Sequence, residues 1–381
     1  MAGDAAPPGP DGPRLADVKP ADVKPADVKL DQGLAAAPAA GLAAPGEPFP
    51  GVTNERITLL FGLPRSGTTW LAKLFDSHPD VLYRHEPDSI RRGKHLPEWP
   101  GPDPSPAELA SARAYLAELL RVRTLKSAGS LPMFGKHFRG SAAHALRLGL
   151  AQALHGLGAL RGGRKLSRAI AIPDLIARSA SGRLHIVLKS VTSPHRLGLL
   201  AGAVPGCRTI LLLRHPCGQV ASMLRGAQAG LFEEKLELDL PWLLRSPAAH
   251  RHGLTAASFA RLEPAEQLAW RWVILAEQAS TALERLPRAR LVRHGDLSAE
   301  PETALRALFS FAGLDWNPQS EAFLRRSTHG VGPQRYYGVF RDSTREVDKW
   351  RRELDGPTQR RILAVVRNSS LAKLWPDGLD G

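Results

Sequence analysis

The stretch ITLLFGLPRSGTTWLAKLF at residues 57–75 combines the groups that bind a phosphate. Its first apolar residues predict a short buried strand, the Gly and Pro residues that follow predict a tight turn, and the rest predicts an amphipathic helix. Such a turn aims backbone N–H groups and the positive end of the helix dipole at one point. Arg65 adds charge-assisted donors, and Thr68 and Thr69 add hydroxyls. The lysine and glycine spacing of a nucleoside-triphosphate loop is missing.

A second basic site follows another predicted strand, in RTILLLRHPCGQVASML at residues 208–224. The apolar run Ile210–Leu213 is typical of a strand buried on both faces of a parallel sheet. Arg214 follows it directly, at the strand end where ligands bind in open α/β sheets. Ser222 comes eight residues later, about two turns into the predicted helix. The spacing of Arg214 and Ser222 alone is not specific. Its position directly after a buried strand, downstream of the first loop, indicates a ligand-binding site.

The order PRSGTTWL resembles the 5′-phosphosulfate loop of the sulfotransferases, which use 3′-phosphoadenosine 5′-phosphosulfate (PAPS) as donor. The resemblance extends over roughly residues 55–365. It implies that Arg214 and Ser222 bind the 3′-phosphate, and that Trp70 packs either against the adenine or in the core. It implies no metal, because arginine and amide groups replace the magnesium of a kinase. The residues that it assigns to the 5′-phosphate are Arg65, Ser66, Gly67, Thr68 and Thr69.

Two later segments resemble further parts of the nucleotide site. In RLVRHGDLSAEPETALRALFSFAGL at residues 290–314, His294 stands where the family often has a tyrosine near the adenine, and we expect it to stack or to hydrogen-bond there. STREVDKWRREL at 343–354 resembles the C-terminal segment that closes over the nucleotide. Arg345, with Ser343 and Lys349, is therefore a candidate phosphate contact, although the start of a surface helix explains these residues equally well.

Three residues are assigned to the chemistry of transfer. Arg65 stabilises the leaving phosphate as a fixed positive charge. Lys189 ends the predicted strand of LHIVLKSVTSP at 184–194, and it resembles the Lys-Ser/Thr-Pro element of bacterial and carbohydrate sulfotransferases, although the proline comes later here. We expect it to stabilise the sulfonate oxygens; a lysine that reaches solvent from a strand end is the alternative.

Glu86, in YRHEPD at 83–88, resembles the Glu-Pro motif that carries the general base in carbohydrate-type sulfotransferases. We expect burial near the acceptor to raise its pKa towards neutrality, whereas an ion pair with Arg84 or Arg91 is the simpler explanation. Its rival is His137 in FGKHF, since cytosolic sulfotransferases of phenols and steroids use a histidine after a strand. No clear strand precedes His137, and His85 is expected to point away from Glu86.

Residues 91–180 are the expected acceptor-binding insertion, with predicted helices at 107–125 and 142–160. Residues 91–170 hold fourteen Lys/Arg against four Asp/Glu. This charge indicates either an anionic acceptor, such as an acidic glycan, or a solvated basic surface. A hydroxyl or an amine is the expected acceptor group, and lipid, small-alcohol and peptide acceptors remain compatible with the sequence.

Composition separates a tail from a catalytic domain. Residues 1–50 are rich in Ala, Pro and Gly, repeat the unit ADVKP and are expected to be disordered, and residues 51–381 form the catalytic domain. The sequence predicts neither a signal peptide nor a transmembrane anchor. Cys207 and Cys217 offer no disulfide framework. We therefore expect a cytoplasmic protein, whose oligomeric state the sequence does not indicate.

The expected fold class is α/β, with a mainly parallel central sheet, helices on both faces, a P-loop-like phosphate-binding topology and a helical acceptor-binding insertion. A nucleotide kinase is the first alternative, but it would need the Walker lysine. A noncatalytic PAPS-binding protein is the second. A pI near 10.3 suggests nucleic-acid binding, but the positive charge is spread along the chain and no recognition motif is present.

Overall fold

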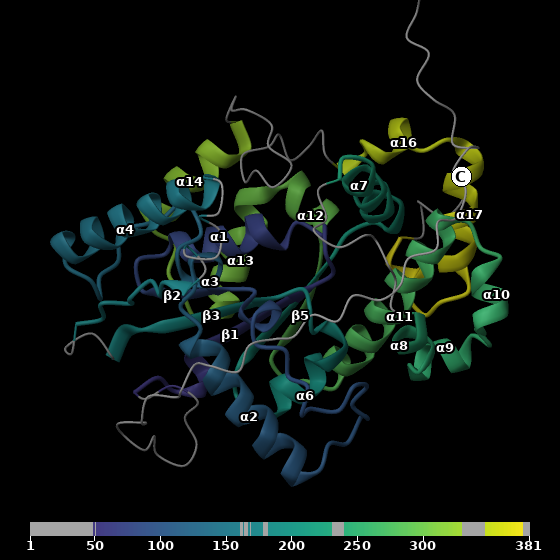
Figure 1. Ribbon diagram of the computed structural model, residues 1–381, viewed down its shortest axis with the longest axis horizontal. Helices are drawn as coiled ribbons and strands as arrows, with labels where there is room; N and C mark the ends of the chain where they lie inside the picture. The colour runs from purple at the N-terminus through teal and green to yellow at the C-terminus, as the bar shows by residue number, and fades with distance from the viewer. Residues whose placement is uncertain are drawn as a thin grey trace, which may run out of the picture. The chain divides into compact units, whose positions relative to one another are not determined.

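The structure of the chain is a computed structural model that describes residues 49, 51–160, 163, 167, 169–177, 182–230, 240–329 and 347–375. All but residue 49 of the predicted tail therefore lie outside the described residues. Five parallel strands form one sheet in the order β2-β3-β1-β4-β5 (Figure 1). Their bounds are β1 Ile57–Gly62, β2 Val81–His85, β3 His185–Ser190, β4 Arg208–Leu213 and β5 Ala289–Arg293. The predicted α/β fold with a parallel sheet is confirmed.

Side chains along each strand alternate between two buried cores. In β1, Ile57, Leu59 and Phe61 belong to one hydrophobic cluster, and Leu60 belongs to another. Successive side chains of a strand point to opposite faces, so both faces of this sheet are covered. The continuous apolar runs of the sequence follow from this double burial.

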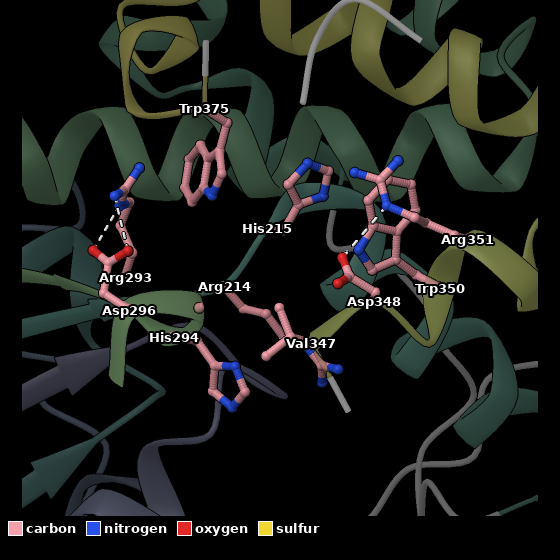
Figure 2. Close-up of a pocket in the computed structure, with 11 residues that line it drawn as sticks. Arg214, His215, Arg293, His294, Asp296, Val347, Asp348, Trp350, Arg351 and Trp375 are labelled. Atoms are coloured by element: carbon pink, nitrogen blue, oxygen red, sulfur yellow. Dashed lines mark hydrogen bonds and ion pairs between the residues drawn. The ribbon is translucent and has the colours of Figure 1, made fainter. Parts of the chain in front are cut away.

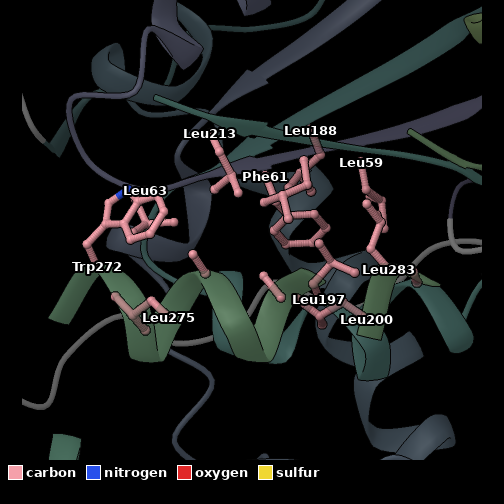
Figure 3. Close-up of a cluster of buried hydrophobic side chains, with 14 of the residues drawn as sticks. Leu59, Phe61, Leu63, Leu188, Leu197, Leu200, Leu213, Trp272, Leu275 and Leu283 are labelled. Atoms are coloured by element: carbon pink, nitrogen blue, oxygen red, sulfur yellow. The ribbon is translucent and has the colours of Figure 1, made fainter. Parts of the chain in front are cut away.

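Helices cover both faces of the sheet. The first core packs against helices that include α2 (Pro106–Arg121), α6 (Leu197–Gly202) and α11 (Pro264–Glu284). Figure 3 shows α11 presenting Trp272, Leu275 and Leu283 towards strand side chains of this core. The second core packs against α1, α13 and α14, which lie above the sheet in Figure 1, with bounds Thr68–Ser77, Pro301–Ala312 and Pro318–His329.

The topology brings five loops to one edge. Because all strands are parallel, their carboxyl ends lie together, and the chain leaves the sheet there after each strand. Strand β1 is central, β2 and β3 lie on one side of it, and β4 and β5 lie on the other. Crevices at such reversals of strand order are where α/β sheets bind ligands.

The segment between β2 and β3 is helical, as expected. It contains α2, α3 (Leu125–Ala128) and α4 (Ser141–Ala159). The helix predicted at 107–125 ends instead at Arg121, and α3 begins separately behind an N-cap formed by Thr124. The second predicted helix, at 142–160, is confirmed as α4 within one residue at each end.

The other α-helices of the described residues follow β4 in the chain. They are α7 Pro216–Gln228, α8 Leu240–Leu244, α9 Pro247–Arg251, α10 Ala256–Ala260, α12 His294–Ala299, α16 Trp350–Glu353 and α17 Gly356–Arg367. Within the described ranges, no helix is both long and apolar enough to cross a membrane. Nor do the described residues bring together three or more His, Cys, Asp or Glu side chains as a metal site would need.

Candidate active site

The loop after β1 has the backbone of an anion site. Arg65 and Gly67 both adopt a left-handed conformation, with φ of 71° and 86°. Helix α1 starts directly behind Gly67, and no side chain caps it. The first N–H groups of a helix have no partner within the helix, so they are available to a ligand. The buried hydroxyl of Ser66 also has no hydrogen-bond partner among the described residues. These features fit a bound phosphate group.

Close packing holds this loop in place. A Cβ atom on Gly67 would lie 2.4 Å from Cδ2 of His294, and one on Gly62 would lie 2.7 Å from the carbonyl oxygen of Leu212. Only glycine allows such approaches together with the positive φ of Gly67. His294, at the start of α12, therefore lies against the phosphate loop itself.

The two predicted phosphate-binding motifs contact each other. Arg65 Nε donates a hydrogen bond of 3.0 Å to Oγ of Ser222, and Arg214 donates through Nη1 to the carbonyl oxygen of Arg65 at 3.4 Å. Gln219, also on α7, donates through Nε2 to the carbonyl of Pro64 at 2.9 Å. The structure thus brings the two sequence motifs into direct contact, although they lie about 150 residues apart.

A cavity of about 220 Å³ opens beside Arg214 (Figure 2). Its lining comes from the β4–α7 junction, the β5–α12 junction and the C-terminal segment around α16. His215 stacks on Trp350 with ring centroids 4.4 Å apart and an interplanar angle of 7°, and it meets Trp375 edge-on. Burial lowers the pKa of His215 to about 4, so the ring is neutral. The site offers aromatic walls next to a buried guanidinium.

The two residues predicted to contact the adenine, His294 and Trp70, lie in different surroundings. His294 lines the cavity beside Arg214, and its role towards the nucleotide stays a prediction. Trp70 donates from Nε1 to Oγ of Ser327 on α14 at 3.0 Å and packs against the second core. Its packing matches the core alternative weighed for this residue. Arg345 lies outside the described residues.

Glu86 lies just beyond β2 at the same edge, in a left-handed conformation with φ of 45°. Its Oε1 is ion-paired with Lys189, and its Oε2 lies 2.9 Å from Nζ of Lys126. Burial alone would raise the pKa of Glu86, but the Lys189 ammonium, with smaller effects of His85 and Lys126, holds it well below its ordinary value. The expected rise towards neutrality is therefore wrong for this arrangement of charges. Glu86 is therefore ionised, which is the charge state that a general base needs.

Lys189 connects Glu86 with the phosphate loop. Its side chain is 1% exposed, and its Nζ lies 3.3 Å from Oγ1 of Thr69. Burial lowers the pKa of Lys189, and the neighbouring Glu86 opposes this effect. The side chain does not reach solvent, so the alternative of a strand-end lysine directed to water is wrong. A buried ammonium instead stands between the candidate base and the candidate donor site.

The rival base lies elsewhere. His137 donates its backbone N–H to the carbonyl oxygen of Pro79 and pairs through Nδ1 with Asp80 at 2.9 Å, and its side chain is 63% exposed. Asp80 precedes β2, so His137 lies at the amino end of the sheet, opposite the Glu86 edge. Glu86 pairs with Lys189 and Lys126 and not with Arg84, which instead pairs with Asp174 at 2.6 Å. The geometry favours Glu86.

Three neighbours of this site were not singled out from the sequence in these roles. His85 was expected to point away, but the turn at Glu86 leaves its Nε2 3.8 Å from Oε1 of Glu86. Asp88 is buried and accepts hydrogen bonds from the hydroxyls of Ser190 and Ser193, which ties the loop after β2 to β3. In the sequence, Lys126 is only one of the many basic residues between 91 and 170. Only folding of the insertion brings its ammonium to Glu86.

Several known proteins are similar to this chain. A model described as "Sulfotransferase family" matches residues 58–318. Human carbohydrate sulfotransferase 6 is 26% identical over 386 residues, which cover 89% of this chain and 90% of the relative. Mouse carbohydrate sulfotransferase 5 is 25% identical over 343 residues, covering 82% and 79%. Among solved structures, a sulfotransferase domain from the curacin biosynthetic pathway is 16% identical, covers 86% of this chain and 99% of its own, and has a TM-score of 0.39.

Proposed function

The chain belongs to the sulfotransferase family and is a PAPS-dependent sulfotransferase, and on this premise we propose that its acceptor is a carbohydrate hydroxyl that approaches Glu86. One observation carries the assignment of roles. Lys189 contacts both Glu86 and Thr69, so a single buried ammonium joins the base to the phosphate loop.

Each residue has one task in the proposed transfer. Glu86 accepts the proton of the acceptor hydroxyl as the acceptor oxygen forms its bond to sulfur. The bond between sulfur and the 5′-phosphate oxygen breaks at the same centre, and its electron pair stays on the phosphate. Arg65 and the N–H groups at the start of α1 stabilise that charge, and Lys189 stabilises the sulfonate oxygens. Arg214 and Ser222 hold the 3′-phosphate of the donor.

Before an acceptor hydroxyl can reach Glu86, it has to displace Lys126. Each carboxylate oxygen of Glu86 already contacts an ammonium group, Lys189 at Oε1 and Lys126 at Oε2. Lys126 is 49% exposed and also donates to Oγ of Ser89 at 2.9 Å. Being the more exposed partner, it is the one that an acceptor hydroxyl displaces. The released ammonium then lies beside the acceptor, where an anionic glycan would pair with it.

The carbohydrate assignment is supported by the relatives, which are carbohydrate sulfotransferases matched over most of their length. Exposed basic residues support an anionic acceptor: Lys126 contacts Glu86, and Arg91, Arg92 and Lys94 follow Glu86 closely in the sequence. The division at residue 50 and the cytoplasmic location also remain proposals. Two buried free thiols, Cys207 and Cys217, are compatible with a reducing compartment. Fractionation of the native cells tests the location, and release of a stable core by limited proteolysis near residue 50 tests the division.

Labelled PAPS tests the acceptor class. We expect the purified chain to transfer ³⁵S from PAPS to an acidic oligosaccharide, and to transfer less to its neutral counterpart. Phenol and simple alcohols serve as competing acceptor classes in parallel reactions. Transfer to phenol with none to either oligosaccharide would contradict the carbohydrate proposal while leaving the donor assignment intact.

A further inference from the structure

A second group of charged side chains lies between β2 and the helical segment that follows it. Five basic side chains and two carboxylates interact there: Lys73, Arg84, Lys136, Arg139 and Arg147 with Asp76 and Asp174. The side chain of Lys136 is 6% exposed, and the other four basic residues are also more than nine-tenths buried. With every group ionised, five positive charges against two negative charges leave a formal surplus of three within the described part of the chain.

The two carboxylates are already used by three of the cations. Asp76 accepts from Lys73 through Oδ2 at 2.8 Å and from Lys136 through Oδ1 at 3.1 Å. Asp174 pairs with Arg84 at 2.6 Å. These contacts account for both oxygens of Asp76, whereas the buried Oδ1 of Asp174 has no hydrogen-bond partner among the described residues.

The other two cations donate their hydrogen bonds to carbonyl groups in the described ranges, and Arg139 also lies over the ring of Phe138. Arg139 donates to the backbone carbonyl of Asp174 at 2.8 Å, and Arg147 donates to the carbonyls of Pro173 and Ala128. Carbonyl groups satisfy the N–H donors, but they do not neutralise the charge. Asp174 and Asp76 act on both guanidinium groups through space, but burial and the repulsion of Arg147 outweigh them and lower the pKa of Arg139 to about 10. Burying more positive than negative charge is costly.

A small cavity opens next to these side chains. Its volume is about 20 Å³, and a single water needs roughly 10–15 Å³, so it has room for one small species. Basic side chains from Lys136, Arg139 and Arg147 line one part of it, and Phe134 and Phe138 line another. Asp76 also lines the cavity, with both of its oxygens paired to Lys73 and Lys136. Strand β2 and α3 also contribute to the wall.

We propose that this cavity binds one small monovalent anion, for which chloride is the probe, between Lys136, Arg139 and Arg147. The anion supplies part of the missing negative charge. Because the lining comes from β2 as well as from the segment after it, the bound anion stabilises the attachment of the acceptor-side insertion to the sheet. This site is separate from the proposed donor and acceptor sites, so it does not depend on their assignment.

Bromide and thermal unfolding test the site. Crystals of the full chain grown in sodium bromide should show an anomalous peak in the cavity. Replacing sodium gluconate by sodium chloride at constant ionic strength should raise the Tm, as binding to the native state requires. Arg147→Gln should lose this response, and Arg121→Gln, an exposed change on α2, should keep it.

Two results would overturn the proposal. One is the absence of a bromide peak beside Lys136, Arg139 and Arg147 in the native chain. The other is an unchanged chloride response in Arg147→Gln. Should Arg147→Gln fail to fold, the bromide measurement on the native chain decides alone.

Discussion

Glu86 carries the proposed proton transfer, and its neighbours set its chemistry. Its carboxylate contacts Lys189 and Lys126, so it is ionised across the physiological pH range. We expect Glu86→Gln to bind donor nucleotide normally and to lose about 10²- to 10⁴-fold in turnover, the usual contribution of a general base. Calorimetry with the bisphosphate product and a ³⁵S transfer assay measure the two quantities.

His137→Ala is the matched control for that change. It removes the rival base at the opposite end of the sheet, where the imidazole is exposed and pairs with Asp80. Full activity is expected. Loss of activity in His137→Ala with full activity in Glu86→Gln would reverse the assignment of the base.

Arg214 should distinguish nucleotides by their 3′-phosphate. Loss of a hydrogen bond to a charged group costs about 1.5–3 kcal/mol, which is roughly 10- to 150-fold in Kd. Arg214→Ala should therefore weaken binding of 3′-phosphoadenosine 5′-phosphate by this factor and leave AMP binding nearly unchanged. Arg306→Ala, an exposed change on α13, is the control. Equal losses for both nucleotides would contradict the role of Arg214.

Lys126 should act on the pH dependence through Glu86. Its ammonium is one of the groups that lower the pKa of Glu86, so its removal raises that pKa. In Lys126→Met, the acid limb of the kcat/KM profile should move to higher pH. Lys94→Met, an exposed change in the same segment, should leave the limb in place. An unmoved limb in Lys126→Met would show that Lys126 does not contact Glu86 in the free enzyme, whose ionisations the kcat/KM profile reports.

At the level of elements, the turn from β1 into α1 depends on glycine. Gly67→Ala would place a Cβ 2.4 Å from His294 at a φ of 86°. Such strain costs about 1–3 kcal/mol, so the free energy of unfolding should fall by that amount and nucleotide affinity should fall with it. Gly149→Ala, in α4 with no atom within 4 Å of its Cβ, should instead stabilise by about 0.5–1 kcal/mol. Urea unfolding of both variants makes the comparison, and equal effects would contradict the strained turn.

The local sequence pattern was sufficient to predict the strands that carry the donor site. Buried runs before Gly62 and Arg214 predicted β1 and β4, and parallel topology then brought their carboxyl ends together. The pairing of Lys126 with Glu86 was beyond such reasoning, because it depends on how α3 folds back on β2. The same holds for His137, whose position at the opposite edge follows from its contact with Asp80.

The charge state of Glu86 shows a second limit of the sequence. Its burial suggested a raised pKa, but the spatial neighbour Lys189, which is 103 residues away in the chain, reverses the direction. Long-range electrostatics depend on distances that a linear pattern does not contain.

For the whole molecule, the buried basic cluster near Lys136 links stability to pH. Burial lowers the pKa of Lys136 from 10.5 to about 8. Between these values the unfolded chain binds a proton that the native chain does not, so the free energy of unfolding rises with pH, by at most ~3.4 kcal/mol. In gluconate buffer, urea unfolding should show this rise in the native chain, and Lys136→Met should lack its share. Parallel curves for the two proteins would refute the linkage.

The donor assignment is tested most directly by calorimetric titration of the full chain with 3′-phosphoadenosine 5′-phosphate beside AMP. The contact of Arg65 with Ser222 and the position of Arg214 against the loop predict micromolar binding of the bisphosphate. AMP should bind at least about tenfold more weakly, because it lacks one charge-assisted contact. Equal affinities would contradict a 3′-phosphate site at Arg214 and Ser222.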